Sequence, residues 1–172
     1  MKKVLSITAL VAAFAFTLSS CGCDDETKKQ PVTPPAEDMM VPPAAEAISN
    51  TLTLSAHDEM KFDKTELKAL AGKPITLTFA HIGTMDKNTM GHNFILLKKG
   101  TDIDDFVKKA LTAKDNDYIP KSESDKIIAH TKLLPGGATD TIEFTVPEKG
   151  TYDFICSFPG HAATMRGKFI VE

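Results

Sequence analysis

The sequence lacks an excess of basic charge, an apolar run long enough to span a membrane, and the cysteines of a disulfide framework. Its formal charge is -3 over 172 residues, so nothing favours a nucleic-acid partner. The apolar run Val4–Leu18 is shorter than the ~20 residues that a membrane-spanning helix needs. The length suggests one ordinary domain with appendages.

The N-terminus has the order of an export signal, so we predict that residues 1–20 are a signal peptide. Lys2 and Lys3 precede the apolar run, and two serines separate that run from Cys21. Leu18-Ser-Ser-Cys21 also resembles the lipobox of bacterial lipoproteins, which implies that the Cys21 thiol is lipidated. An ordinary signal peptide with a chance cysteine nearby is the alternative.

Removing residues 1–20 removes only two lysines, which takes the formal charge from -3 to -5. We therefore expect a mildly acidic, exported protein that is anchored to a bacterial membrane through Cys21 and faces the periplasm or the cell surface. Gly22 follows Cys21 where an aspartate would signal retention in the inner membrane, so the outer membrane is expected.

Residues 21–49 are rich in proline, alanine and acidic residues and show no apolar period. This composition predicts a lipidated N-terminus followed by a flexible tether. The three cysteines are an odd number, which indicates a thiol kept free for another purpose. If Cys21 is lipidated, the only possible disulfide joins Cys23 to Cys156, and we do not expect it because it would tie the tether to the folded part.

Residues 50–172 change to short β-branched and aromatic runs separated by turn residues, a pattern typical of an all-β sandwich. The predicted strands are 51–56, 74–80, 93–98, 139–146, 151–156 and 167–171. Apolar residues of 140–146 alternate with polar ones, with Ile142, Phe144 and Val146 facing the core. One helix is expected within residues 103–111, after Thr101 or Asp102 as its cap.

A loop near the C-terminus carries three side chains that bind soft metals. Cys156, His161 and Met165 have the spacing Cys-x4-His-x3-Met between two predicted strands, and a Pro-Gly pair supplies a turn. His92 lies far upstream, just before another strand. Taken singly, a cysteine is often a small buried hydrophobe, a histidine a hydrogen-bonded residue and a methionine a gap filler. The combined spacing favours a shared site.

Two imidazoles, one thiolate and one thioether form the ligand set of blue-copper electron-transfer centres. Thiolate and thioether favour the cuprous ion, while imidazole suits both oxidation states. A single copper ion of type 1 is therefore the expected cofactor.

The chain from Thr51 to Glu172 resembles the azurins, within the cupredoxin family. The segments that carry the resemblance are Met60-Lys61-Phe62, Met90-Gly91-His92-Asn93, Ile128–Leu133 and Cys156–His161. The resemblance implies a Greek-key cupredoxin β-sandwich with one short helical insertion over residues 50–172. It also implies that His92, Cys156 and His161 are equatorial ligands, Met165 a weak axial ligand and the Gly91 carbonyl a weak contact opposite it.

Further roles follow from the same resemblance. Asn93 is expected to bridge the two ligand loops, with Ser157 beside it and backbone donors near Phe158 reaching the Cys156 sulfur. His161 is expected to expose one edge within an apolar patch that suits brief contacts with c-type cytochromes or periplasmic redox enzymes. The residues of this docking patch are Met60, Met85, Met90, Phe158, Pro159 and Ala163.

The sequence also departs from the azurins. The positions of their usual disulfide, near Asn50 and Gly72, hold no cysteine, Phe94 stands where tryptophan is usual, and Thr164 replaces a larger apolar residue. His81 and His130 match azurin positions and are expected to be structural or weakly pH-responsive, whereas His57 lies in no motif.

Electron transfer between redox proteins is therefore the predicted function, and we do not expect an enzyme. A copper-binding protein for storage, delivery or defence is the main alternative because it would use the same ligands. A thiol enzyme with Cys156 as nucleophile and His161 as base is a second alternative, but it leaves His92 and Met165 unexplained. Zinc could occupy the site as an artefact of metal supply.

Overall fold

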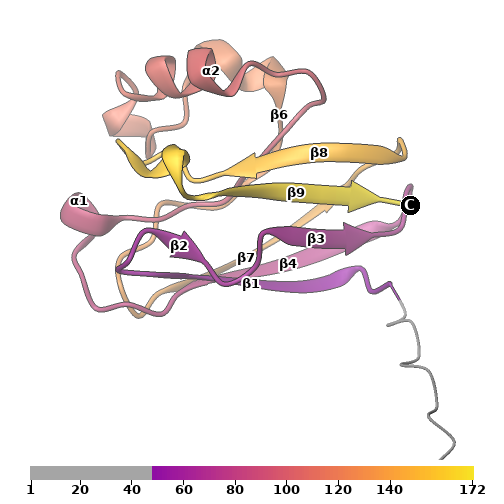
Figure 1. Ribbon diagram of the computed structural model, residues 1–172, viewed down its shortest axis with the longest axis horizontal. Coiled ribbons are helices and arrows are strands. Elements are labelled where there is room, and N and C mark those ends of the chain that lie inside the picture. The colour runs from indigo at the N-terminus through magenta and orange to yellow at the C-terminus, as the bar shows by residue number, and fades with distance from the viewer. Residues whose placement is uncertain (1–47) are drawn as a thin grey trace, which may run out of the picture. The chain divides into compact units, whose positions relative to one another are not determined.

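The computed structural model describes residues 48–172 of the chain (Figure 1). The predicted signal peptide, the lipidation site Cys21 and nearly all of the predicted tether lie outside the described residues. Within residues 48–172, no helix is both long and apolar enough to cross a membrane.

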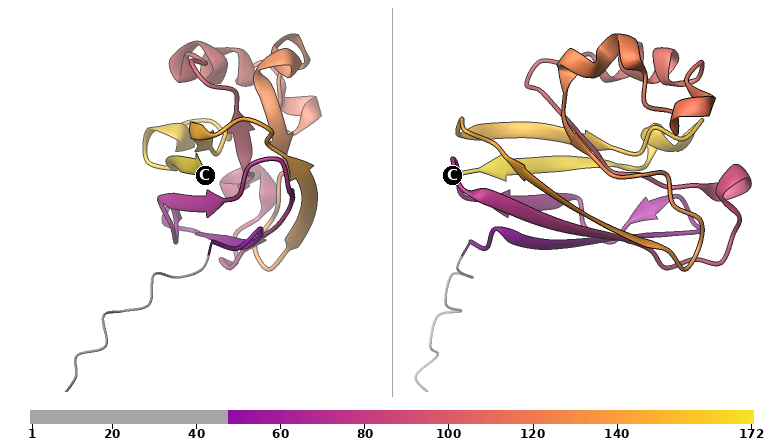
Figure 2. Two further views of the ribbon diagram at one scale, coloured as in Figure 1. Left: turned by 90° about the vertical axis from the view of Figure 1, so that its right-hand side faces the viewer. Right: turned by 180° about the vertical axis from the view of Figure 1, so that it is seen from behind.

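Two sheets pack face to face as a β-sandwich (Figure 2). The first sheet has the order β2-β1-β4-β7 and the second β3-β9-β8-β5-β6, and the pairs β1·β4 and β3·β9 are parallel while the others are antiparallel. The strands are β1 (Thr51–His57), β2 (Lys61–Phe62), β3 (Glu66–Ala69), β4 (Pro74–His81), β5 (Ile95–Leu97), β6 (Ile127–His130), β7 (Thr139–Thr145), β8 (Gly150–Ile155) and β9 (Arg166–Val171).

The core between the sheets is built from alternating residues of facing strands. Every second residue of β4 is buried. Burial also alternates along the neighbouring strand β7, where Ile142 and Phe144 are half-buried, and Val146 just beyond it is buried. Phe79, Phe94, Phe154 and Phe169 fill the centre of this core. The predicted all-β class and its alternation are thus confirmed.

Strand β5 is buried on both faces because a helical segment covers the outer face of its sheet. Helix α2 (Ile103–Ala110) lies over the sheet that contains β8 (Figure 1). Its apolar side packs on β5 and β8 in the second core cluster, which consists of Ile95, Leu97, Phe106, Ile119 and Ile155. The Asp102 side chain caps α2 by accepting a hydrogen bond from the Asp105 N–H. The predicted helix is therefore confirmed, with Asp102 as its cap.

The sequence did not predict the shortest elements. These are β2, β3, β6, the four-residue helix α1 (Lys87–Met90) and three short 3-10 helices, at Lys114–Asn116, Lys121–Lys126 and His161–Ala163. Strands of two to four residues offer too few alternating positions to register as a pattern. Strand β5 is also shorter than its predicted range, 93–98, and His92 before it forms an isolated bridge with Leu134.

Candidate metal centre

The loop between β8 and β9 is folded so that its ends close on each other. Cys156 follows β8, and its N–H donates to the Met165 carbonyl at 3.0 Å, just before β9 begins. The His161 carbonyl accepts the Met165 N–H at 2.7 Å, and Gly160 takes a positive φ of 83° that favours glycine. The Cys-x4-His-x3-Met spacing is thereby converted into one compact turn between two paired strands.

His92 enters the same end of the sandwich from the segment between α1 and β5. Its backbone pairs in both directions with Leu134, at 3.1 and 2.8 Å. Gly91 is required beside it, because a Cβ at that position would lie 2.5 Å from the Lys87 carbonyl oxygen and 2.9 Å from the Leu133 side chain. The bonds to Leu134 and the close packing at Gly91 therefore fix the position of the His92 backbone.

Three ligand atoms converge in the interior. His92 Nδ1 lies 3.1 Å from His161 Nδ1 and 4.0 Å from Cys156 Sγ, and His161 Nδ1 lies 3.7 Å from the same sulfur. All three residues are buried. In the part of the chain that the structure describes, this is the only group of three or more His, Cys, Asp or Glu side chains so arranged.

The hydrogen bonds around His92 show that these atoms suit a metal ion. His92 Nε2 lies 2.9 Å from the His57 carbonyl, which can only accept, so Nε2 carries the proton and Nδ1 presents a lone pair. That lone pair points at a second imidazole nitrogen and a thiol. The three donor atoms are 3.1 to 4.0 Å apart. These separations fit one ion bound at about 2.0–2.3 Å from each donor, the distances typical of nitrogen and sulfur ligands.

Burial sets the protonation of the three groups. It lowers the pKa of His92 to about 4, with the neighbouring His81 and His161 adding to the effect, and it lowers the pKa of His161 to about 4 as well. Both imidazoles are therefore neutral at pH 7 and able to bind a cation. Burial also raises the pKa of the Cys156 thiol to about 11, so a metal must displace its proton.

Asn93 joins the segment of His92 to the segment of Cys156 through hydrogen bonds to Ser157. Its Oδ1 accepts the Ser157 N–H at 2.9 Å, and its Nδ2–H donates to the Ser157 hydroxyl at 2.9 Å. The backbone N–H groups of Asn93 and Phe158 reach the Cys156 sulfur and counteract the effect of burial on its pKa. The sulfur is thus hydrogen-bonded before any metal binds.

Met165 and Gly91 lie at the same end of the fold. Met165 is fully buried and belongs to the main core cluster together with Cys156 and Phe158. Gly91 directly precedes His92 and follows α1. Their roles as weak axial contacts remain predictions, since they depend on a bound ion.

Other histidines contribute to the site only indirectly. The His81 ring packs edge-on against His92 with centroids 4.3 Å apart, and its two nitrogens face Asp58 Oδ1 at 3.0 Å and the Leu134 carbonyl at 3.2 Å. His57 contributes its carbonyl, and His130 lies outside the cluster. The contact of Asp58 with His81 was not predicted, because an isolated aspartate in a turn forms no recognisable sequence pattern.

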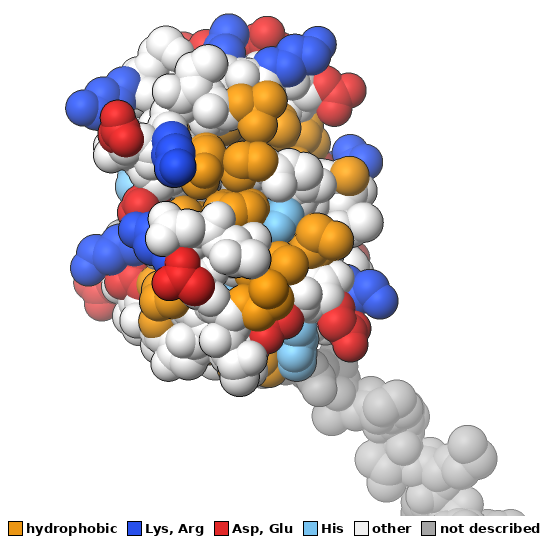
Figure 3. All heavy atoms as spheres, turned by 90° about the vertical axis from the view of Figure 1, so that its left-hand side faces the viewer, with side chains coloured by type: hydrophobic (Ala, Val, Ile, Leu, Met, Phe, Trp, Pro, Cys, Tyr) orange, Lys and Arg blue, Asp and Glu red, His pale blue; other side chains and the backbone are white. Residues whose placement is uncertain are grey.

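Apolar side chains gather on the face that covers the ligands, with charged groups around them (Figure 3). Met60 is 39% exposed, Ala163 is exposed, and Met85, Met90 and Pro159 are half-buried. The sequence predicted more exposure for Phe158 and His161 than the structure shows. Phe158 is only 7% exposed because its ring packs on His161 and Tyr118, and His161 itself is 3% exposed.

The comparisons agree with this geometry. The family described as copper binding proteins, plastocyanin/azurin family, matches residues 49–172. The chain therefore belongs to the plastocyanin/azurin family of copper-binding proteins, and the cofactor predicted for it is copper.

Three similar proteins illustrate the relationship. Azurin-1 of Alcaligenes xylosoxydans xylosoxydans is 38% identical over 122 residues, which cover 68% of this chain and 93% of that protein. Outer membrane protein H.8 of Neisseria meningitidis serogroup B is 39% identical over 119 residues, which cover 67% of this chain and 64% of that protein, so the match spans less than two thirds of its length. Auracyanin A, a "blue" copper protein of Chloroflexus aurantiacus, superposes with a TM-score of 0.64 and 35% identity, covering 71% of this chain and 98% of that structure.

Proposed function

We propose that this protein carries single electrons between redox proteins on the periplasmic side of a bacterial membrane. A type 1 copper held by His92, Cys156, His161 and Met165 would supply the electron-accepting centre by changing between Cu(II) and Cu(I). The observation that carries the proposal is the convergence of two imidazole Nδ1 atoms and one thiol inside a buried, hydrogen-bonded pocket.

The surrounding residues suit electron transfer because they restrict motion. His92 is fixed by the His57 carbonyl, the cysteine segment by Asn93, and the loop ends by backbone bonds between Cys156 and Met165. A site that hardly rearranges when its charge changes exchanges electrons quickly. The N–H groups that reach the Cys156 sulfur would also adjust its electron donation, and hence the reduction potential.

The apolar face supports a transient partner. Met60, Met85, Met90, Phe158, Pro159 and Ala163 would contact c-type cytochromes or periplasmic redox enzymes. A small patch without a dense charge cluster suits complexes that bury little area and separate quickly. We propose that electrons enter and leave through this face, across the slightly exposed edge of His161.

A thiol enzyme is disfavoured by the state of Cys156. The residue is fully buried, and its raised pKa of about 11 leaves the thiol protonated at pH 7, whereas a nucleophilic cysteine needs access and a low pKa. Copper storage or delivery stays the alternative, because the same ligands would serve it.

The experiment that separates the two functions follows copper and electrons together. The copper-loaded protein is reduced and reoxidised repeatedly with a c-type cytochrome, in the presence of a cuprous chelator. An electron carrier reacts in both directions and keeps its copper, whereas a storage or delivery protein loses Cu(I) to the chelator.

A patch variant tests the docking face in the same assay. Met60→Asp should slow the reaction with the cytochrome roughly tenfold, because a charge would be placed in an apolar contact. Leu70→Asp is the matched control, since Leu70 is similarly exposed but lies beside Asn50, at the far end of the sandwich. Equal rates for the two variants would contradict the proposed docking face.

A further inference from the structure

Two consecutive residues in the loop after α2 have a backbone conformation that side chains disfavour. Asp117 and Tyr118 have φ angles of 54° and 59°, in the left-handed region. A non-glycine residue there costs about 1–2 kcal/mol, and aspartate tolerates it better than most. Such strain persists only where the surrounding structure holds it, so the contacts of this pair are informative.

The Asp117 backbone reaches the residue that joins the ligand loops. Its carbonyl accepts the Asn93 Nδ2–H at 3.1 Å, while the same amide group donates to Ser157 at 2.9 Å. The two protons of the Asn93 amide thus have two acceptors, and the amide oxygen faces the Ser157 N–H at 2.9 Å. Asp117 therefore fixes the rotation of the Asn93 side chain.

The Asp117 carboxylate holds the segments on either side of His92. Oδ2 accepts the Leu133 N–H at 3.2 Å, and Oδ1 pairs with Lys87 Nζ at 2.7 Å. Lys87 begins α1, which leads into Gly91 and His92, and Leu133 packs where Gly91 leaves no room for a Cβ. One side chain thus connects both segments that position the His92 backbone.

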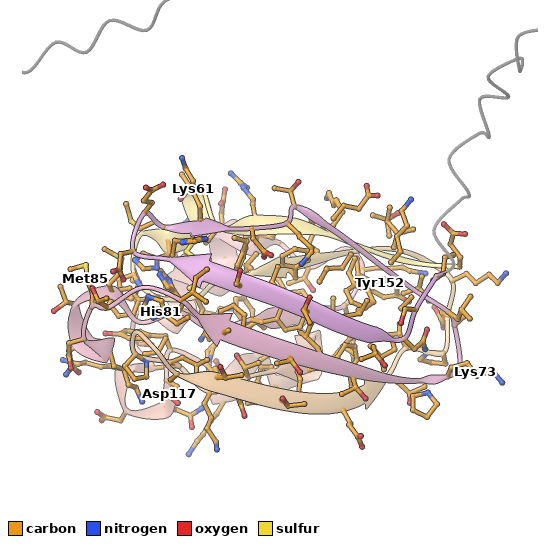
Figure 4. All side chains as sticks on the ribbon, turned by 90° about the horizontal axis from the view of Figure 1, so that it is seen from below. Lys61, Lys73, His81, Met85, Asp117 and Tyr152 are labelled. Carbon is orange, nitrogen blue, oxygen red and sulfur yellow. The ribbon has the colours of Figure 1, made fainter. Side chains whose placement is uncertain are left out.

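Tyr118 is linked to His161 through the ring of Phe158. Its ring meets the Phe158 ring edge-on with centroids 5.2 Å apart, and Phe158 packs on His161 at 4.6 Å. In Figure 4, Asp117 lies at the same end of the sandwich as His81 and Met85, the end that holds the ligands. The pair therefore contacts the surroundings of His92, Cys156 and His161 from outside the ligand loops.

We propose that Asp117 and Tyr118 form a positioning element for the copper centre, which sets the Asn93 amide and through it the hydrogen bonds at the Cys156 sulfur. The left-handed backbone turns the Asp117 carbonyl toward Asn93 while its carboxylate faces Lys87 and Leu133. This inference rests on the proposed copper site, but its first readout is in the copper-free protein.

The first test measures exchange of the Asn93 side-chain amide protons by NMR in the metal-free chain. Asp117→Ala keeps the carbonyl that accepts from Asn93 but removes the carboxylate that holds this backbone to Leu133 and Lys87, so exchange should accelerate about tenfold, the order expected for the loss of one hydrogen bond. Asp117→Asn tolerates a positive φ and keeps an acceptor for Leu133, so it should change exchange little. Asp115→Ala, an exposed neighbour in the same loop, is the matched control.

The second test uses the copper-loaded variants. Asp117→Ala should weaken copper binding by roughly tenfold and shift the reduction potential, while Asp115→Ala leaves both unchanged. A purely structural role would lower the stability of the metal-free protein and leave the potential of the loaded protein where it is. That result, or unchanged Asn93 exchange in Asp117→Ala, would overturn the inference.

The two proposals fail in different ways. If the unmodified protein forms no coloured copper complex, the proposed function fails, whatever Asp117 does to Asn93. If the unmodified protein is blue and Asp117→Ala has the same potential and the same Asn93 exchange, only the positioning role fails.

Discussion

At the scale of single residues, the site depends on groups whose protonation is set by burial. His92 and His161 are neutral at pH 7, and Cys156 keeps its proton until a metal replaces it. A buried thiol beside two imidazole nitrogens is a poor nucleophile and a good ligand. The chemistry therefore follows from where the residues lie as much as from what they are.

The pH dependence of the metal-free protein follows from the two histidines. Their pKa values fall from 6.5 to about 4 on folding, so the unfolded chain binds protons more tightly than the folded one. Their contribution to the free energy of unfolding is full above pH 6.5 and is lost as the pH falls through about 4. Urea unfolding at pH 7, 5.5 and 4.5 should show this decline.

A matched pair of variants isolates the histidines in that experiment. His161→Gln should flatten the decline between pH 6.5 and 4, because one of the two buried imidazoles is removed. His130→Gln removes an exposed histidine outside the site and should leave the decline as it is. The same slope in both variants would contradict the assignment.

At the scale of elements, the sandwich supplies the rigid ends between which the ligand loops are held. Strands β8 and β9 close the loop from Cys156 to Met165, while α2 covers the outer face of β5 and β8. The helical insertion also leads into the segment that holds Asp117. We therefore expect the stability of this helical insertion to affect the position of Asp117 as well as the stability of the fold.

The cap of α2 gives a test at this scale. Asp102→Ala removes the acceptor of the Asp105 N–H and should lower the free energy of unfolding by about 1 kcal/mol, the usual cost of losing an N-cap. Chemical denaturation measures it. Asp104→Ala, on the exposed side of the same helix, should cost less, and an equal loss in both variants would contradict a specific contribution of the Asp102 cap.

The longer elements could be predicted from the sequence, and the shortest could not. Strands such as β4 and β7 alternate over seven or eight residues, and α2 repeats its apolar residues with a helical period. The sequence also brought His92, Cys156 and His161 to one candidate site, where the structure clusters them, because their spacing and chemistry are specific. The supporting contacts of Asp58 and Asp117 depend on tertiary approach between distant segments, which leaves no local pattern.

At the scale of the whole domain, the ligands and the start of the described chain lie at opposite ends of the sandwich. Asn50, just before β1, bonds to the turn between β3 and β4 through Leu70 and Pro74. Figure 4 shows Lys73 of that turn at the end away from His81 and Met85. Asn50 and the turn between β3 and β4 thus lie at the end of the domain away from the apolar face.

The proposed anchor can be tested by changing the lipidation residue. Cys21→Ala should move the protein from the membrane fraction to the soluble periplasmic or secreted fraction, because the chain would lose its lipid. The visible spectrum of its copper complex should not change, since Cys21 precedes the folded domain. Retention of the variant in the membrane fraction would contradict anchoring through Cys21.

The central claim is that Cys156, His92 and His161 hold one copper ion as a type 1 centre. The most direct measurement adds cupric ion to the purified metal-free protein and records the visible spectrum. We predict an intense thiolate-to-copper charge-transfer band that saturates at one ion per chain and is absent in Cys156→Ser. A colourless complex, or a band that survives in Cys156→Ser, would contradict the account.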